Sequence, residues 1–171
     1  ATKVFSNHLK QDQVIKACNR SLKHLDRDYI DLYQIHWPSG SFGHPPVPLE
    51  ETIGALVELK SQGKIRAIGV SNFNLEQLTA ACSLTQIDSI QPPYSLFWRM
   101  IEKEILPYCQ ENTVTVLAYS SMAQGLLTGR FEAGHKFKRG DNRSGNILFQ
   151  KENFERALAA VDQLRPIADK Y

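Results

Sequence analysis

The feature that most constrains the fold is the alternation of short apolar runs with amphipathic segments along the whole chain. Each apolar run is bounded by turn residues, which is typical of a buried parallel strand. The runs recur about every 25–35 residues, and apolar residues repeat at helical spacing between them. Strands that are each followed by a helix form βαβ units and predict a parallel sheet. The expected strands are Ala1–Phe5, Ile30–Trp37, Ile65–Ser71, Ser89–Tyr94 and Val114–Ser121.

Apolar stripes predict the helices between these strands, and local signals mark several of their ends. Gly63 can end the second helix, and Asn74 with Gln77 forms a capping-box pattern at the start of the third. A last helix is expected over about Asn153–Tyr171, with a bend at Pro166. The four earlier stripes lie within residues 14–25, 53–59, 75–82 and 101–109.

Two α/β architectures fit this alternation, a doubly wound sheet and a (β/α)8 TIM barrel. No Gly-x-Gly-x-x-Gly sequence follows any expected strand, which disfavours a dinucleotide-binding doubly wound sheet. A closed barrel uses eight strands and about 250 residues, whereas 171 residues here show five strands. The prediction is therefore a single domain over residues 1–171 that forms a partial (β/α)8 barrel.

Composition excludes several classes of function. The net charge of +2 is small and scattered, which argues against nucleic acid and anionic membranes as partners. No apolar run is long enough to span a membrane, and the first residues resemble neither a signal nor a transit peptide. Cys18, Cys82 and Cys109 are too far apart for a disulfide framework or a zinc site. We expect a cytoplasmic protein with reduced thiols and no metal.

Polar residues follow the strand ends, where the active sites of α/β barrels lie. His36 ends the second strand on the same face as Gln34, although a single histidine there more often has a structural role. Lys3 lies inside an apolar strand, where its ammonium needs an anion or solvent. Amide and hydroxyl groups that suit an amide ligand end the next two strands, at Ser71, Asn72 and Gln91.

Two long irregular segments leave the carboxyl ends of strands, Ser39–Leu49 and Thr128–Gln150. Long loops at this edge are often binding loops, and for the second segment a mobile surface insertion is an equally good interpretation. The fifth strand ends at Tyr119-Ser120-Ser121. The glycine-bearing turn Gln124–Gly129 that follows could offer backbone N–H groups to a phosphate.

Together these residues resemble the aldo-keto reductases, (β/α)8-barrel enzymes that reduce aldehydes and ketones with NADPH. The resemblance runs in order through essentially the whole chain, and the segment that ends in Ser-Asn-Phe is its most specific part. The matching segments are Ala1–Val4, Asp28–Pro38, Gly63–Phe73, Gln91–Leu96 and Ala118–Gly129.

The resemblance implies a role for each matching residue and NADP(H) as the cofactor. Lys3 and His36 match the catalytic lysine and histidine, and Trp37 and Trp98 lie where the family often lines its substrate pocket. The other implied contacts are to the cofactor. Ser71, Asn72 and Gln91 match the groups that hold the nicotinamide carboxamide, Tyr119 matches the ring that stacks on the nicotinamide, and Ser120, Met122, Gln124 and Leu126 fall in the pyrophosphate loop.

The resemblance also implies that the domain lacks the first strands and the last strand of the barrel. It implies a tyrosine that protonates the carbonyl oxygen and an aspartate that holds the lysine, and neither motif occurs within residues 1–171. We therefore expect either a portion of a longer enzyme or a truncated chain, inactive alone and open to self-association through unpaired strand edges. The leading function is reduction of a small carbonyl substrate by hydride transfer. A non-catalytic cofactor-binding regulatory subunit is the alternative, and His36, which such subunits replace by asparagine, favours the enzyme. A barrel hydrolase or lyase would need carboxylate or metal-ligand clusters at the strand ends.

Overall fold

The computed structural model describes residues 1–171 and contains one five-stranded parallel sheet with strand order β1-β2-β3-β4-β5. Each strand therefore lies beside its predecessor, and the order never reverses. Right-handed crossovers then place the connecting helices on one face, as in a barrel, whereas a doubly wound sheet reverses its order. The predicted partial (β/α)8 barrel is confirmed. The strands are β1 Thr2–Val4, β2 Ile30–Ile35, β3 Ile65–Ser71, β4 Ser89–Gln91 and β5 Thr115–Val116.

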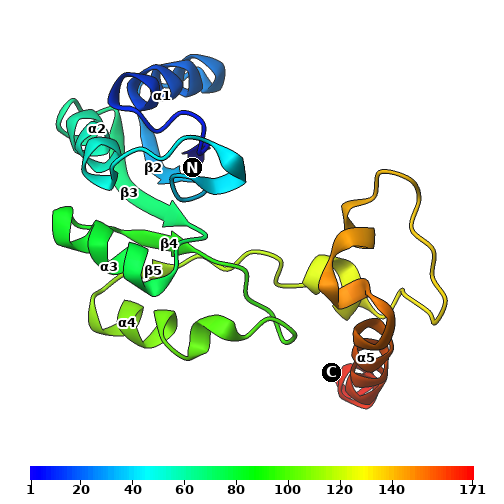
Figure 1. Cartoon of the computed structure of the whole chain (residues 1–171). Helices are drawn as coiled ribbons and strands as arrows, with labels where there is room; N and C mark the ends of the chain where they lie inside the picture. The colour runs from blue at the N-terminus through cyan, green and yellow to red at the C-terminus, as the bar shows by residue number, and fades with distance from the viewer. The chain divides into compact units, whose positions relative to one another are not determined.

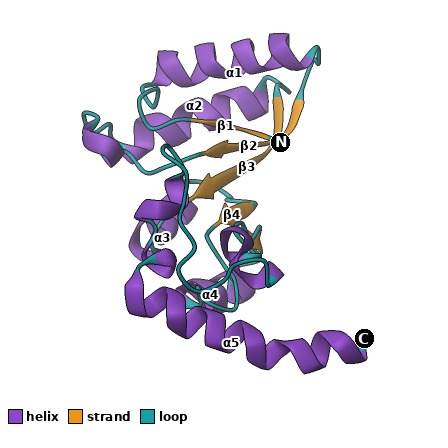
Figure 2. Ribbon diagram, turned by 90° about the vertical axis from the view of Figure 1, so that its right-hand side faces the viewer, coloured by secondary structure: helices purple, strands orange, loops and turns teal.

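Four helices connect the strands, and a fifth ends the chain (Figure 1). Helices α1 and α2 lie side by side along the sheet, which is also visible in Figure 2. The buried positions of α1 are Val14, Ala17, Cys18 and Leu22, four members of the apolar stripe predicted for it. The fifth, Leu25, is exposed at the end of the helix. The helices are α1 Gln11–Leu25, α2 Leu49–Ser61, α3 Leu75–Leu84, α4 Ile105–Glu111 and α5 Lys151–Lys170.

The chain divides into two compact units. The first unit comprises Ala1–Pro92 and Ile101–Leu117 and holds the whole sheet with α1–α4. Its core is a continuous cluster of buried side chains from the sheet and these helices, most of them aliphatic, with Tyr33 and Phe73 among them. The second unit comprises Pro93–Met100 and Ala118–Tyr171, and it has a separate core that is rich in phenylalanine.

Several elements are shorter than predicted, for local reasons. Strand β4 stops before Pro92, because proline has no N–H to donate to a ladder. Beyond β5, Tyr119 forms only an isolated bridge to Pro93. The apolar stripe over residues 101–109 is split into a 3₁₀ turn and α4, which begins at Ile105 and so places Pro107 in its first turn. Helix α5 begins at Lys151 and continues through Pro166.

The predicted helix ends agree with the structure. The backbone N–H of Gln77 donates to Asn74 Oδ1 at 2.8 Å, and the N–H of Asn74 donates to Gln77 Oε1 at 3.0 Å. This reciprocal pair is a complete capping box at the start of α3. Gly63 has a φ of +71°, the left-handed conformation that glycine adopts after a helix, two residues beyond the last residue of α2.

Replacing the capping residue should destabilise the fold measurably. We expect Asn74→Ala to lower the free energy of unfolding by about 1 kcal/mol, because the backbone N–H of Gln77 in the first turn of α3 loses its acceptor. Urea unfolding followed by circular dichroism measures this change. Ser83→Ala, at an exposed position of the same helix, is the matched control and should change stability by less than about 0.5 kcal/mol. Equal effects of the two substitutions would contradict the capping role.

Candidate active site at the strand ends

The carboxyl ends of β2, β3 and β4 are joined by hydrogen bonds among the predicted site residues. Asn72 Nδ2 donates to the backbone oxygen of His36 at 3.0 Å and to Ser71 Oγ at 3.1 Å. Ser71 Oγ donates to the backbone oxygen of Gln91 at 2.8 Å, and the N–H of Asn72 donates to the same oxygen at 3.2 Å. Four residues from three strands are thus held in one cluster.

Asn72 can make these bonds because its backbone leaves the extended conformation. Its φ is +61°, in the left-handed region that asparagine tolerates better than most residues. The chain turns there between β3 and α3, and the amide side chain reaches back across the sheet edge to β2. The sequence Ser71-Asn72 therefore supplies both a strand end and the residue that ties three strands together.

Lys3 and His36 occupy neighbouring strands of the same unit. Lys3 pairs in register with Gln34, two residues before His36, and the backbone N–H of His36 donates to the backbone oxygen of Val4 at 2.9 Å. Burial lowers the pKa of His36 below its ordinary value, and the positive charge of Lys3 lowers it further. His36 is consequently a neutral imidazole at pH 7, and one of its ring nitrogens carries a hydrogen.

Aromatic rings surround His36 on the side of the loop that follows β2. Phe5 meets the His36 ring edge-on with centroids 5.5 Å apart, and Phe42 stacks on Phe5 at 5.5 Å. Trp37, a predicted substrate residue, packs edge-on against Phe42 at 5.1 Å. No sequence pattern marks Phe42, which has a φ of +59° in a turn between two glycines.

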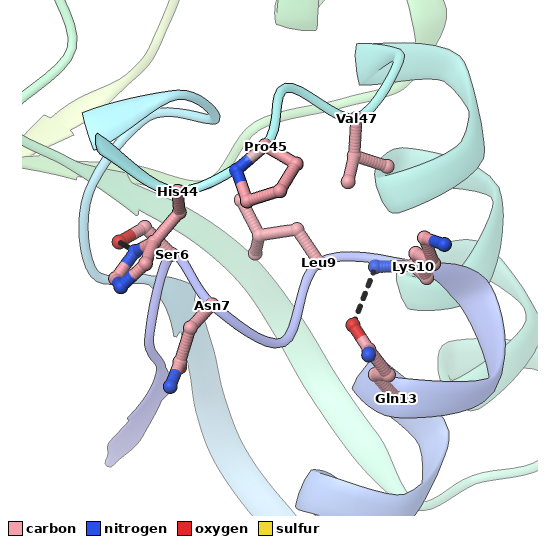
Figure 3. Close-up of a pocket in the computed structure, with 8 residues that line it drawn as sticks. All are labelled: Ser6, Asn7, Leu9, Lys10, Gln13, His44, Pro45 and Val47. Atoms are coloured by element: carbon pink, nitrogen blue, oxygen red, sulfur yellow. Dashed lines mark hydrogen bonds between the residues drawn. The ribbon is translucent and has the colours of Figure 1, made fainter. Parts of the chain in front are cut away.

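A small cavity of about 220 Å³ lies between the β1–α1 connection and this loop (Figure 3). The Ser6 hydroxyl and His44 Nδ1 share a hydrogen bond of 3.0 Å at its edge, and Ser6 is buried. Farther along, the N–H of Val47 donates to Ser39 Oγ. The second bond closes the loop 39–49 on itself, and the first ties its middle to the β1–α1 connection, so that the aromatic side chains extend from a restrained backbone.

A buried polar layer lies beneath the cluster and was not assigned a role from the sequence. Gln34 and Ser89 are buried, and Gly69 lies between them in register. The sequence does contain an indication of this layer, because a glutamine on the same strand face as His36 is unusual in a buried strand.

The second unit contains the remaining predicted residues. A cavity of about 130 Å³ is lined by Trp98, Tyr119, Ser120 and Gln124 together with residues from the 93–95 and 146–148 segments. Burial raises the pKa of Tyr119, so its phenol is neutral at pH 7. Met122 is exposed, whereas the side chain of Leu126 is fully buried. Any contact of Leu126 with a ligand must therefore come from its backbone.

The glycine-bearing turn has an unusual backbone. Ala123, Gln124 and Gly125 have φ values of 47°, 55° and 94°, and the Thr128 hydroxyl donates to the backbone oxygen of Gly125 at 2.6 Å. The backbone N–H groups of Ala123, Gly125 and Leu127 donate to the backbone oxygens of Ser120 and Met122 in the same segment. The anion-binding role expected of this turn therefore stays a prediction.

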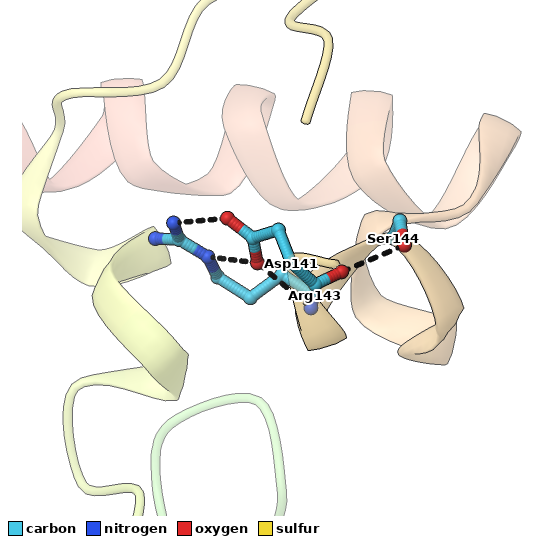
Figure 4. Close-up of polar contacts among 3 residues, drawn as sticks. All are labelled: Asp141, Arg143 and Ser144. Atoms are coloured by element: carbon cyan, nitrogen blue, oxygen red, sulfur yellow. Dashed lines mark hydrogen bonds and ion pairs between the residues drawn. The ribbon is translucent and has the colours of Figure 1, made fainter. Parts of the chain in front are cut away.

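The segment 128–150 folds around an aromatic cluster rather than as a simple extended loop. Arg143 donates from Nε at 2.9 Å and from Nη2 at 2.6 Å to the Asp141 carboxylate (Figure 4). Its guanidinium carbon lies 5.5 and 5.3 Å from the ring centres of Phe131 and Phe137. Hydrogen bonding to Arg143 holds the pKa of Asp141 at about 2. The hydrogen bonds and ring contacts of Arg143 described here all lie within the second unit.

Two kinds of feature are absent from the chain. No group of three or more His, Cys, Asp or Glu side chains could hold a metal ion. None of the helices combines the length and the apolar character that crossing a membrane requires.

Comparison with known proteins agrees with this geometry. The sequence profile of the Aldo/keto reductase family matches residues 1–171. Aldo-keto reductase YhdN of Bacillus subtilis is 44% identical over 94% of this chain and 47% of its own length. The NADH-specific methylglyoxal reductase of Escherichia coli is 36% identical over 96% of this chain and 49% of its own length.

Solved structures give the same result. The glycerol dehydrogenase of Gluconobacter oxydans matches with a TM-score of 0.86 and 42% identity, over 94% of this chain and 48% of its own. An aldo-keto reductase from Klebsiella pneumoniae in complex with NADPH matches with a TM-score of 0.64 and 35% identity, over 78% and 46% of the two chains. The chain spans about half the length of these relatives. The chain belongs to the aldo/keto reductase family.

Proposed function

We propose that the protein is a nicotinamide-dependent oxidoreductase that reduces an aldehyde or ketone to an alcohol. The observation that carries this proposal is the strand-end cluster, in which Asn72 and Ser71 join the main chain at His36 and Gln91, with the charge of Lys3 acting on the His36 imidazole. We regard residues 1–171 as one reductase-like domain, although they divide into two compact units. Three free cysteines favour a cytoplasmic location.

The residues of the cluster fit a carboxamide ligand. A carboxamide needs both hydrogen-bond donors and acceptors in one plane, and Ser71, Asn72 and Gln91 supply both types. No charged group is needed to hold it. In the second unit, the proposed cofactor residues are Tyr119, Ser120, Met122, Gln124 and Leu126.

NADP(H) is the proposed cofactor, as in the Klebsiella pneumoniae structure that contains NADPH. The Escherichia coli relative is NADH-specific, so both dinucleotides belong in any assay. When bound, the reduced nicotinamide supplies the hydride.

His36 and Lys3 are the proposed catalytic residues of this chain. The neutral imidazole of His36 donates a hydrogen bond to the carbonyl oxygen of the substrate and fixes its orientation. The nearby ammonium of Lys3 adds positive charge where negative charge develops on that oxygen. The exposed rings of Phe5 and Phe42, with Trp37, offer an apolar wall to the rest of the substrate, and Trp98 is the proposed substrate residue of the second unit.

Removing the imidazole tests this role directly. In the full gene product that contains this sequence, we expect His36→Ala to reduce kcat for methylglyoxal reduction by about 10²–10³-fold, the usual effect of losing one donor to a developing oxyanion. Oxidation of NADPH or NADH at 340 nm measures the rate. His24→Ala, at an exposed position in α1, is the control and should behave as wild type.

The same assays distinguish a carbonyl reductase from a non-catalytic regulatory subunit, the two functions that the sequence left open. Tight binding of NADP(H) without turnover of any aldehyde or ketone would favour the regulatory subunit. Turnover that is insensitive to His36→Ala would contradict the proposed site.

The protonation state of His36 gives a second prediction. Its pKa should lie below the ordinary value of 6.5, and Lys3→Met should raise it without fully restoring that value, because burial remains. Proton–carbon NMR of the imidazole across the pH range measures the midpoint. Lys16→Met, whose ammonium pairs with Asp12 on α1, is the control and should leave the midpoint unchanged. A midpoint above 6.5 in the wild type would contradict the neutral role of His36.

Residues 1–171 alone should lack carbonyl reductase activity. The family resemblance implies a tyrosine as proton donor, and no tyrosine of this chain occupies the matching motif. The purified 171-residue polypeptide, assayed with NADPH and methylglyoxal, is therefore expected to show no turnover above a buffer blank. Measurable turnover would show that the chain contains its own proton donor.

A further inference from the structure

The side chain of Gln34 has no part in the proposed reaction, yet it is almost completely buried, with 2% of its surface exposed. A buried amide costs free energy unless its donors and acceptors are paired. Its Nε2 donates to Gln91 Oε1 at 3.0 Å, and its Oε1 accepts from Ser89 Oγ at 3.5 Å. Both partners lie on β4, although Gln34 is on β2.

Gln34 can reach β4 only because β3 carries a glycine between them. Gly69 is in register with Gln34 on one side and with Ser89 on the other. A Cβ atom on Gly69 would lie 2.5 Å from Ser89 Oγ, 2.9 Å from Gln34 Cγ and 3.1 Å from Gln34 Oε1. Gly69 has no positive φ, so the glycine is required by space and not by backbone conformation.

The hydrogen bond from Gln34 acts on the side-chain amide of Gln91, which takes no part in the strand-end cluster. The backbone oxygen of Gln91 is held by Ser71 and Asn72, which fixes the main chain. The side-chain amide of Gln91 is only partly buried, and its hydrogen bond with Gln34 sets the direction in which the amide points. Without this hydrogen bond, the Gln91 amide would be free to rotate and would lose rotamer entropy when it bound a ligand.

We propose that Gln34 is a positioning residue, which reaches across the space left by Gly69 to orient the Gln91 amide for the nicotinamide carboxamide. This inference rests on the proposed function, because it assumes that Gln91 contacts that carboxamide. It predicts that Gln34 affects binding of the nicotinamide half of the cofactor and leaves the adenosine half unaffected.

The first test compares two ligands on the full gene product. Gln34→Met keeps the length of the side chain and removes its hydrogen bonds. We expect it to weaken binding of NADP⁺ by about 3- to 10-fold, the range for one neutral hydrogen bond. Binding of 2′-phospho-ADP-ribose, which lacks the nicotinamide, should not change. Isothermal titration calorimetry measures both dissociation constants, and a purely structural role would weaken both ligands alike.

A second variant leaves every hydrogen-bonding group in place. Gly69→Ala inserts a methyl group into the space that Gln34 crosses, and it should reproduce the selective loss of NADP⁺ binding. Gly54→Ala is the matched control, because nothing lies within 4 Å of the added Cβ on α2. It should bind both ligands as the wild type does. Thermal unfolding checks that each variant is folded.

A third measurement does not depend on any ligand. In the free protein, the side-chain N–H₂ signals of Gln91 in a ¹⁵N–¹H NMR spectrum should shift and sharpen in Gln34→Met, because the amide becomes mobile. Unchanged Gln91 signals, or equal loss of both ligands, would overturn the inference while the proposed function stands. Failure of the wild-type protein to bind NADP⁺ would overturn both.

Discussion

The register of the parallel sheet is the constraint on which the rest of the site depends. Pairing places Lys3 beside Gln34, Gln34 beside Gly69, and Gly69 beside Ser89, so that these side chains lie in one layer. The next layer toward the strand ends contains Ser71 in register with Gln91. A slip of one residue would turn each side chain to the opposite face of its strand. The site is therefore a property of the sheet as much as of its residues.

The composition of these layers distinguishes this sheet from an ordinary barrel interior. Barrel interiors are filled mainly by branched apolar residues. Here the layer beneath the strand ends contains a glutamine, a glycine and a serine, and the small residue makes room for the large polar one. Such a layer has few ways to pack, because each buried polar atom needs a partner. This restriction on packing fixes the geometry of the strand-end cluster above the layer.

Much of this arrangement could be predicted from the sequence, because apolar periodicity reports which face of an element is buried. The strands, the stripe of α1 and the cap at Asn74 all follow from local patterns that the structure keeps. The position of His36 at a strand end was equally visible. The assignment of Ser71, Asn72 and Gln91 to one ligand came from family resemblance, and the structure brings these three together.

What could not be predicted depends on contacts between distant segments. The stacking of Phe42 on Phe5 requires a loop whose turn is set by two glycines with positive φ, and the role of Gly69 appears only once β2 and β4 are in register around it. The split of the 101–109 stripe, in contrast, has a local cause in Pro107, so the proline marks the split within the sequence itself.

A crystal structure of the full gene product with NADP⁺ would test the strand-end site itself. We predict that the nicotinamide carboxamide lies within hydrogen-bonding distance of Ser71, Asn72 and Gln91, with the reactive face of the ring toward His36. Binding of the nicotinamide elsewhere, with these three side chains keeping only the hydrogen bonds that they make within the protein, would contradict the assignment.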